Sequence, residues 1–157
     1  MNLAEDEARS RLAAARVARL ATIDARGAPH LVPITFAVLA DRIVTAVDHK
    51  PKRTTELARL RNLRAHPRVC VLADHYEERW EALWWVRADG VARILAGDDE
   101  EPEREAALDL LAAKYPQYRL HRPEGPVIAV RVERWTGWAW APAVDETFPV
   151  DEPGKRG

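Results

Sequence analysis

The chain has 157 residues, enough for one domain with a sizeable core, because a domain of about 150 residues buries roughly 68–70% of its unfolded surface. Its 24 basic and 25 acidic residues give a formal net charge of -1, which argues against a general nucleic-acid-binding protein. The single cysteine, Cys70, excludes an intrachain disulfide, and no apolar run approaches the ~20 residues of a membrane span.

The first part of the chain predicts a helix and then three short strands. Apolar residues at helical spacing favour a helix over 4–16, and this acidic start is unlike a signal peptide, so we expect a cytoplasmic protein. Strands are expected over 17–23, 31–39 and 43–47, joined by tight turns into a meander. Pro33 lacks a backbone N–H, so the second strand should lie at a sheet edge, be bulged or be interrupted, and a ligand could use that gap.

The stretch after the third strand is the most informative, because three cations lead straight into a predicted helix. Lys50, Lys52 and Arg53 are stiffened by a proline between them, and Thr54 or Thr55 can cap the helix. Free N–H groups at the helix start would point toward the same space as the cations, which is an arrangement that binds phosphate. From spacing alone, anion binding and a plain basic surface are equally good interpretations, because the glycines of a P-loop are missing.

The second part of the chain predicts helices over 55–65 and 98–115, with Pro116 ending the latter. Strands are expected over 68–73, 82–95, 127–132 and 135–141. The segment 82–95 is either a hairpin turning at Asp89-Gly90 or, as we favour, one strand with a glycine bulge. The pattern predicts a mainly β, α+β domain over 1–148, a small barrel or sandwich of antiparallel strands with helices covering its ends, and a flexible tail over 149–157.

Other kinds of site find little support. The five histidines lack metal-ligand spacing, so no metal site is predicted, and Cys70 reads as a buried, inert thiol. The only serine, Ser10, lies in the first predicted helix without the nucleophile elbow of a hydrolase.

Several segments, taken in order, resemble the split β-barrel family of flavin and deazaflavin oxidoreductases that includes the pyridoxamine phosphate oxidase-like proteins. These segments are 18–23 (ARLATI), 27–33 (GAPHLVP), 50–54 (KPKRT), 61–63 (RNL) with 67–69 (PRV), and 85–90 (WVRADG). In particular, the chain resembles the actinobacterial subgroup of probable coenzyme F420-dependent enzymes. The resemblance implies an FMN-binding-like split β-barrel and a homodimer with each cofactor in a groove at the interface.

The resemblance also implies which residues bind the cofactor. The phosphate or acidic tail would be held by Lys50, Lys52, Arg53 and Thr54. The isoalloxazine-type ring would lie over the backbone around Val32, Pro33, Ile34 and Thr35, flanked by Thr45, Ala46 and Val47. Trp84, Trp85 and Val86 would approach from the partner subunit, although one of the two tryptophans fits equally well as dimer core without cofactor contact.

The charge of the basic stretch favours F420 over FMN. F420 carries a phosphate and a run of glutamates, and the cations, with Arg59, exceed what one phosphate needs. We therefore expect an oxidoreductase that passes hydride from reduced F420 to a small, electron-poor organic acceptor. An FMN-dependent enzyme and a non-catalytic protein that stores or senses the cofactor are the alternatives. No catalytic residue is named, because the ring supplies the hydride chemistry.

The Arg-x-His pair of true pyridoxamine phosphate oxidases is not expected here. Arg119-Leu120-His121 has that spelling, but it lies before the penultimate predicted strand, so we interpret it as chance.

Overall fold

The computed structural model describes residues 1–47 and 57–141 of the chain. Its helices and strands are α1 (Glu5–Ala14), β1 (Ala18–Ile23), β2 (Pro29–Ile34), β3 (Ala37–Leu39), β4 (Arg42–Ala46), α2 (Ala58–Ala65), β5 (Arg68–His75), β6 (Trp84–Leu95), α3 (Glu101–Lys114), α4 (Pro116–Leu120) and β7 (Val127–Ala139). Short 3-10 turns at Trp80–Ala82 and Asp98–Glu100 precede β6 and α3 respectively. The strands form one antiparallel sheet in the order β2-β1-β5-β6-β7-β4-β3, which confirms the α+β prediction.

The two edges of this sheet are joined by a very short link. β2 and β3 lie at opposite ends of the strand order, yet β2 ends at Ile34 and β3 begins at Ala37. With 3.8 Å between successive Cα atoms, the two edges come within roughly 11 Å of each other at this link. The sheet must therefore curl until its edges meet, which produces the expected split β-barrel.

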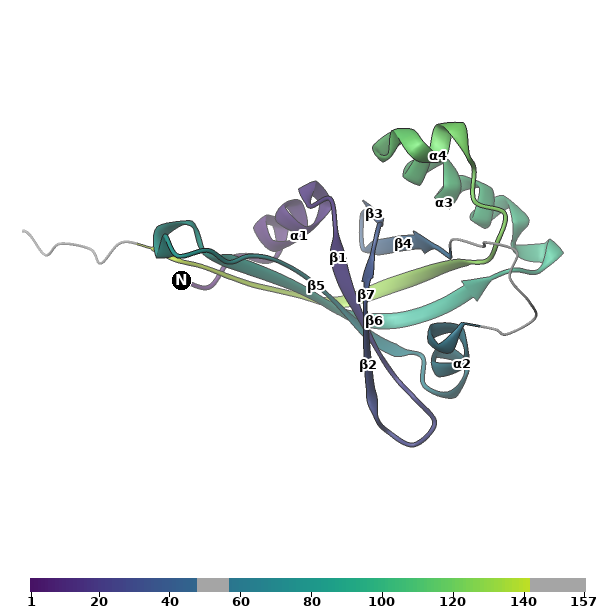
Figure 1. Cartoon of the computed structure of the whole chain (residues 1–157), viewed down its shortest axis with the longest axis horizontal. Coiled ribbons are helices and arrows are strands. Elements are labelled where there is room, and N and C mark those ends of the chain that lie inside the picture. Colours follow the sequence, from purple (N-terminus) through teal and green to yellow (C-terminus); the bar gives the residue numbers. More distant parts are fainter. Residues whose placement is uncertain (48–56, 142–157) are drawn as a thin grey trace, which may run out of the picture.

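Parts of β5, β6 and β7 extend together beyond the barrel, and we call this extension the arm. Figure 1 shows β5, β6 and β7 running together to one end of the molecule, with α1 beside them and with α3 and α4 at the other end. The register between β6 and β7 shifts between Asp89 and Gly90, so the predicted glycine bulge is confirmed and the hairpin alternative is wrong. Glycine is required there because a Cβ at position 90 would collide with the carbonyl oxygen of Arg131.

The buried side chains form two clusters. The first fills the barrel and includes Leu12 of α1, Leu63 of α2, and Phe36 from the link between β2 and β3. The second lies between α3 and the strands next to it, where Leu108 and Leu111 are buried. Alternate residues of β4 belong to different clusters, so this strand is buried on both faces.

The other face of the arm and of β1 and β2 stays more exposed, and we call it the open face. Strand alternation and register place these side chains on it: Arg19, Ala21, Leu31, Cys70, Leu72, Asp74, Trp85, Arg87, Asp89, Thr136 and Trp138. Each of them is partly or well exposed to solvent.

Several element predictions need correction. The strand expected over 31–39 is broken at Thr35 and Phe36, so the first strands form two separate pairs, β1 with β2 and β3 with β4, instead of a meander. The strands expected over 127–132 and 135–141 are one strand, β7. Pro116 ends α3 as predicted, but it also begins α4, which was missed although proline suits the first turn of a helix.

Two predictions about β2 and α2 have different outcomes. Pro33 lies in an edge strand, which is one of the three placements predicted from its missing donor. The described part of the helix expected over 55–65 begins at Ala58, and Leu57 before it provides no side-chain cap. The threonines expected to cap it lie outside the described residues, as does the tail expected over 149–157.

Tyr115, at the C-terminal end of α3, holds the link between β2 and β3. Its hydroxyl oxygen accepts a hydrogen bond from the Phe36 N–H at 3.1 Å. The same hydroxyl lies within donor distance of the carbonyl oxygens of Arg16 (2.9 Å) and Phe36 (3.0 Å). Burial raises the pKa of this hydroxyl, so it keeps its proton. We call the place where the two edges of the sheet meet, at Thr35 and Phe36, the seam. One side chain thus satisfies backbone groups at the seam that the strand pairing leaves without a partner.

Lys114 lies beside the same link. Its Nζ donates to the carbonyl oxygen of Ala15 at 2.6 Å and lies 3.9 Å from the centre of the Phe36 ring. Burial, with a smaller effect of the Arg16 charge, lowers the pKa of Lys114 to about 8. The ammonium group is therefore held by a carbonyl and aromatic faces, and no ion pair links it to a carboxylate of the described chain.

Removing the Tyr115 hydroxyl should destabilise the barrel. In Tyr115→Phe the Phe36 N–H stays buried without its partner, so the free energy of unfolding should fall by about 1–3 kcal/mol in urea denaturation. Tyr118→Phe is the matched control, because it loses a 2.6 Å contact with the Thr35 hydroxyl in a partly buried place and should cost only about 0.5–1.5 kcal/mol. Unchanged stability of Tyr115→Phe would contradict this role.

Lys114 should make the protein gain stability as the pH rises. Its folded-state pKa of about 8 lies below the ordinary 10.5, so between these values the unfolded chain binds more protons than the folded chain. The penalty for burying the charge is complete below pH 8 and is relieved above it. Urea denaturation between about pH 7.5 and 9.5 should show an increase in unfolding free energy in the wild type that Lys114→Met lacks. Parallel pH curves for the two proteins would refute the assignment.

Candidate functional site

The residues predicted to contact the cofactor ring from β2 and β4 come together at the seam of the barrel. The Thr45 Oγ1 donates to the carbonyl oxygen of Thr35 at 2.7 Å, which joins the two segments. Ile34, Thr45, Ala46 and Val47 are buried, Val32 and Thr35 are partly exposed, and Pro33 is exposed. Because β2 is an edge strand, one side of its backbone has no partner in the described sheet, and a ring would have access there.

The predicted residues of β6 do not lie at the edge strand β2 within one chain. Pro33 of β2, Arg19 of β1, Leu72 of β5 and Arg87 of β6 are aligned across four neighbouring strands. With about 4.8 Å between neighbouring strands, Arg87 lies roughly 14 Å from Pro33, and Trp85 lies two residues further along β6. Within a single chain, the predicted residues of β6 are therefore three strands away from the free edge of β2.

The two tryptophans point to opposite faces of β6. Trp84 packs against the core cluster, with the Arg11 guanidinium 5.8 Å from its ring centre, and the side chain of Val86 on the same face is fully buried. Trp85 points to the open face, where it lines a cavity. Of these three side chains, Trp85 is therefore the one best placed to contact a group outside the chain.

The predicted anion-binding residues Lys50, Lys52, Arg53 and Thr54 lie outside the described residues. The start of α2, which follows them, is described, and its first turn carries no acidic residue. Arg59 in that turn is half-buried, and no hydrogen bond or ion pair joins it to any residue of 1–47 or 57–141. Burial lowers the pKa of its guanidinium. A desolvated cation at a helix N-terminus, with no counter-charge among the described residues, is unfavourable on both counts.

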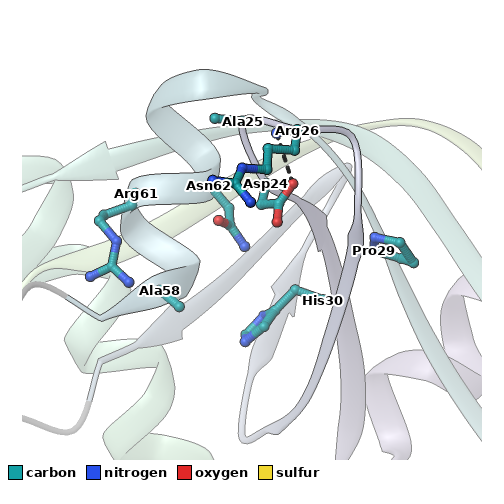
Figure 2. Close-up of a pocket in the computed structure, with 8 residues that line it drawn as sticks. All are labelled: Asp24, Ala25, Arg26, Pro29, His30, Ala58, Arg61 and Asn62. Atoms are coloured by element: carbon teal, nitrogen blue, oxygen red, sulfur yellow. Dashed lines mark hydrogen bonds between the residues drawn. The ribbon is translucent and has the colours of Figure 1, made fainter.

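A cavity of about 600 Å³ lies between α2 and the turn that connects β1 to β2 (Figure 2). Its walls are Asp24, Ala25, Arg26, Pro29, His30, Ala58, Arg61 and Asn62. Figure 2 shows the His30 ring pointing from β2 toward α2. Arg26 and Arg61 bring positive charge to opposite walls, and Asp24 is the single carboxylate among the lining residues.

Local hydrogen bonds hold the walls of this cavity in place. Asp24 Oδ1 accepts from the backbone N–H groups of Arg26 and Ala28, both at 2.9 Å, so part of the carboxylate serves the turn. Gly27 in that turn has φ +85°, which few other residues adopt. The Asn62 amide is buried and donates to the Thr22 hydroxyl at 3.0 Å, which fixes α2 to β1.

His30 has one polar atom whose hydrogen-bonding capacity is unused. Its Nδ1 is buried and has no hydrogen-bond partner among the described residues. Buried polar atoms are rarely left in this state, because the lost hydration is costly. The Nδ1 of His30 is therefore an unusual feature of the cavity wall.

None of the eight lining residues was predicted as a site residue. The sequence carried weak signals, since the β1–β2 turn and the segment 61–63 both belong to the resemblance described above. What it could not indicate is that the turn and α2, separated by more than thirty residues, face each other across a cavity.

No metal centre or membrane span emerges from the residues that the structure describes. Within 1–47 and 57–141, no three His, Cys, Asp or Glu side chains are grouped so that they could hold a metal ion. No helix in these ranges is long and apolar enough to cross a membrane. Cys70 is partly exposed on the open face instead of buried, and partial burial followed by the Asp89 charge raises the pKa of its thiol, which keeps it unreactive.

The chain was compared with known proteins. The family model for pyridoxamine 5'-phosphate oxidase matches residues 4–139. An FAD-binding protein from Mesorhizobium loti is 22% identical with a TM-score of 0.65, covering 87% of this chain and 95% of that chain. A conserved hypothetical protein from Mycobacterium tuberculosis is 22% identical with a TM-score of 0.69, covering 87% and 85% respectively.

Proteins that bind other groups share the architecture. A heme-binding protein from Mycobacterium smegmatis is 26% identical with a TM-score of 0.60, covering 86% of this chain and 57% of that chain. None of the curated proteins compared with the chain matches it in sequence. The family match spans most of the described barrel, from α1 to the end of β7. The chain therefore belongs to the pyridoxamine 5'-phosphate oxidase family.

Proposed function

We propose that the protein is a cytoplasmic, homodimeric oxidoreductase that binds coenzyme F420 in a groove at the dimer interface and passes hydride to a small organic acceptor. The ring would lie along the free edge of β2, beside Thr35 and Thr45, and the anionic part would lie at the start of α2. The bound group would supply the hydride chemistry, and this chain would hold and orient it.

The observation that carries the proposal is Arg59. It is a half-buried cation without a counter-charge among the described residues, in the first turn of the helix that follows the predicted phosphate-binding residues Lys50, Lys52 and Arg53. An anion placed there would offset both the desolvation of Arg59 and the unfavourable position of a cation at a helix N-terminus. A phosphate-bearing cofactor fits these residues better than a neutral ligand does.

The cavity beside α2 favours F420 over FMN. It holds about 600 Å³ and is lined by Arg26, Arg61 and His30, with Asp24 partly engaged by its own turn. A single phosphate would leave most of this volume empty, whereas the phosphate and glutamates of F420 would carry several negative charges along it. His30 lies on β2 two residues before Val32, so the cavity is close in the sequence to the proposed ring position.

A homodimer would account for the open face and for the position of Trp85. Near the barrel this face carries Leu31, Ile23, Ala21 and Cys70, and Leu31 is 66% exposed. Apolar side chains gathered on one face are typical of an interface. Within one chain, Trp85 lies on β6, three strands from the proposed ring position on β2, so its predicted contact with a cofactor would be made by a second subunit.

Flavin binding is the alternative in the same groove. The FAD-binding protein from Mesorhizobium loti supports a flavin-type cofactor on this fold, and an FMN phosphate would also suit the cations near α2. A non-catalytic protein that stores or senses the cofactor remains the alternative from another functional class, because cofactor binding alone does not imply turnover.

Cofactor preference can be measured by titrating the purified protein with F420 and, separately, with FMN, following tryptophan fluorescence. We expect tighter binding of F420 and quenching by the bound ring. Arg59→Gln and Lys52→Ala should each weaken F420 binding by about 1.5–3 kcal/mol if they donate charge-assisted hydrogen bonds. Arg64→Gln is the matched control, because Arg64 is an exposed arginine of the same helix, and it should leave affinity unchanged.

The outcomes separate the hypotheses. Preference for FMN would replace the deazaflavin with a flavin, and binding of neither would refute both cofactor proposals. Equal affinity of wild type, Arg59→Gln and Lys52→Ala would refute the anion-binding role. Steady-state reduction of candidate acceptors by the loaded protein would then distinguish an enzyme from a storage or sensor protein.

A further inference from the structure

A second cavity, of about 360 Å³, lies on the open face of the arm, where Trp85 is proposed above to meet the partner's cofactor. It is lined by Leu72, Asp74, Tyr76, Trp85 and Arg87. None of these residues lines the cavity beside α2, and only Trp85 belongs to the residues predicted to bind the cofactor.

The strand register builds most of this cavity from a square of four side chains. Leu72 of β5 lies directly opposite Arg87 of β6, and Asp74 lies directly opposite Trp85. Directly opposite residues hold their Cβ atoms about 4.5–5.5 Å apart, and residues two apart in a strand share a face. Tyr76 follows immediately after the end of β5, so it closes one end of the square. Ladder hydrogen bonds therefore hold the walls in place.

The lining combines flat apolar surface with a few polar groups. Trp85, Tyr76 and Leu72 provide the apolar walls, and the volume falls within the range of roughly 300–1,000 Å³ typical of small-molecule sites. Two of the five lining residues are aromatic, which suits a ligand that can lie flat against a ring.

The charges around the cavity favour an anionic ligand. Arg87 Nε is 3.2 Å from Asp89, and Arg19 is 3.7 Å from Asp74, so both carboxylates nearby already face a guanidinium. Arg134 is a further cation, 3.6 Å from Asp89, which leaves three arginines against two aspartates in this group. The Arg87 Nε faces Asp89, whereas its terminal nitrogens have no hydrogen-bond partner among the described residues and can donate to both oxygens of a ligand carboxylate.

We propose that this cavity binds a flat aromatic carboxylate, with Trp85 against the ring and Arg87 on the carboxylate. The proposal concerns binding by the protein without cofactor, so it stands or falls independently of the proposed oxidoreductase activity. In the proposed dimer, a ligand here would lie on the arm that reaches toward the partner subunit, which would make this the class of molecule presented to the partner's cofactor.

Isothermal titration calorimetry with benzoate tests the proposal, using cyclohexanecarboxylate and benzyl alcohol as comparison ligands. Wild type should bind benzoate saturably and bind both comparison ligands more weakly, because one lacks the flat ring and the other lacks the charge. Arg87→Gln should weaken benzoate binding by about tenfold or more and leave the weak binding of benzyl alcohol unchanged. Trp85→Leu should weaken both.

Trp80→Leu is the matched control, because Trp80 is 68% exposed on the same arm and does not line the cavity. It should bind benzoate like the wild type. Arg87→Lys, which keeps the charge but loses the planar fork, should be intermediate, and circular dichroism and thermal unfolding would verify that each variant folds. The proposal would be overturned if the folded wild type showed no saturable benzoate binding. It would also be overturned if Arg87→Gln and Trp85→Leu bound benzoate as tightly as the wild type does.

These results differ from those that would overturn the proposed function. Benzoate binding without F420 or FMN binding would retain this site and remove the cofactor proposal. F420 binding without benzoate binding would retain the cofactor proposal and remove this site.

Discussion

The structure depends on a link of two residues, Thr35 and Phe36, between opposite edges of one sheet. Because so short a link cannot span an open sheet, the strands must curl into a barrel, and the backbone of Phe36 is left without ladder partners. Tyr115 satisfies that backbone through its hydroxyl, and the ammonium of Lys114 covers the Phe36 ring. The C-terminal end of α3 is therefore tied to the seam, and the packing of α3 on β3 and β4 follows from this attachment.

The same closure creates the position proposed for the cofactor ring. It brings the Thr35 carbonyl to the Thr45 hydroxyl, and it leaves β2 at the edge with a proline that could not have served an interior strand. α2 is fixed beside this edge by the buried amide of Asn62 and by its leucines, which carry Arg59 and Arg61 to the place where an anion would be stabilised. Structural stability and the proposed binding therefore use the same few contacts.

The arm has a different role from the barrel. Its strands extend past the barrel, and Trp85 lies on β6, three strands from the edge strand β2. The bulge at Gly90 divides β6 between these regions, and alternation along the strand sends Trp84 into the core and Trp85 to the open face. This explains how two neighbouring tryptophans can have unrelated environments.

The sequence alone determined the type and order of most elements, the exclusion of Pro33 from a regular interior strand, the bulge at Gly90 and the family resemblance. These depend on local properties: apolar periodicity, the missing donor of proline and the small size of glycine. Tertiary structure alone decided that the strand expected over 31–39 breaks at Phe36, that β7 is continuous and that α2 faces the β1–β2 turn across a cavity. Those outcomes depend on contacts between residues far apart in the chain. The break in the strand is stabilised by Tyr115, about eighty residues later, whose hydroxyl hydrogen-bonds the backbone of Phe36.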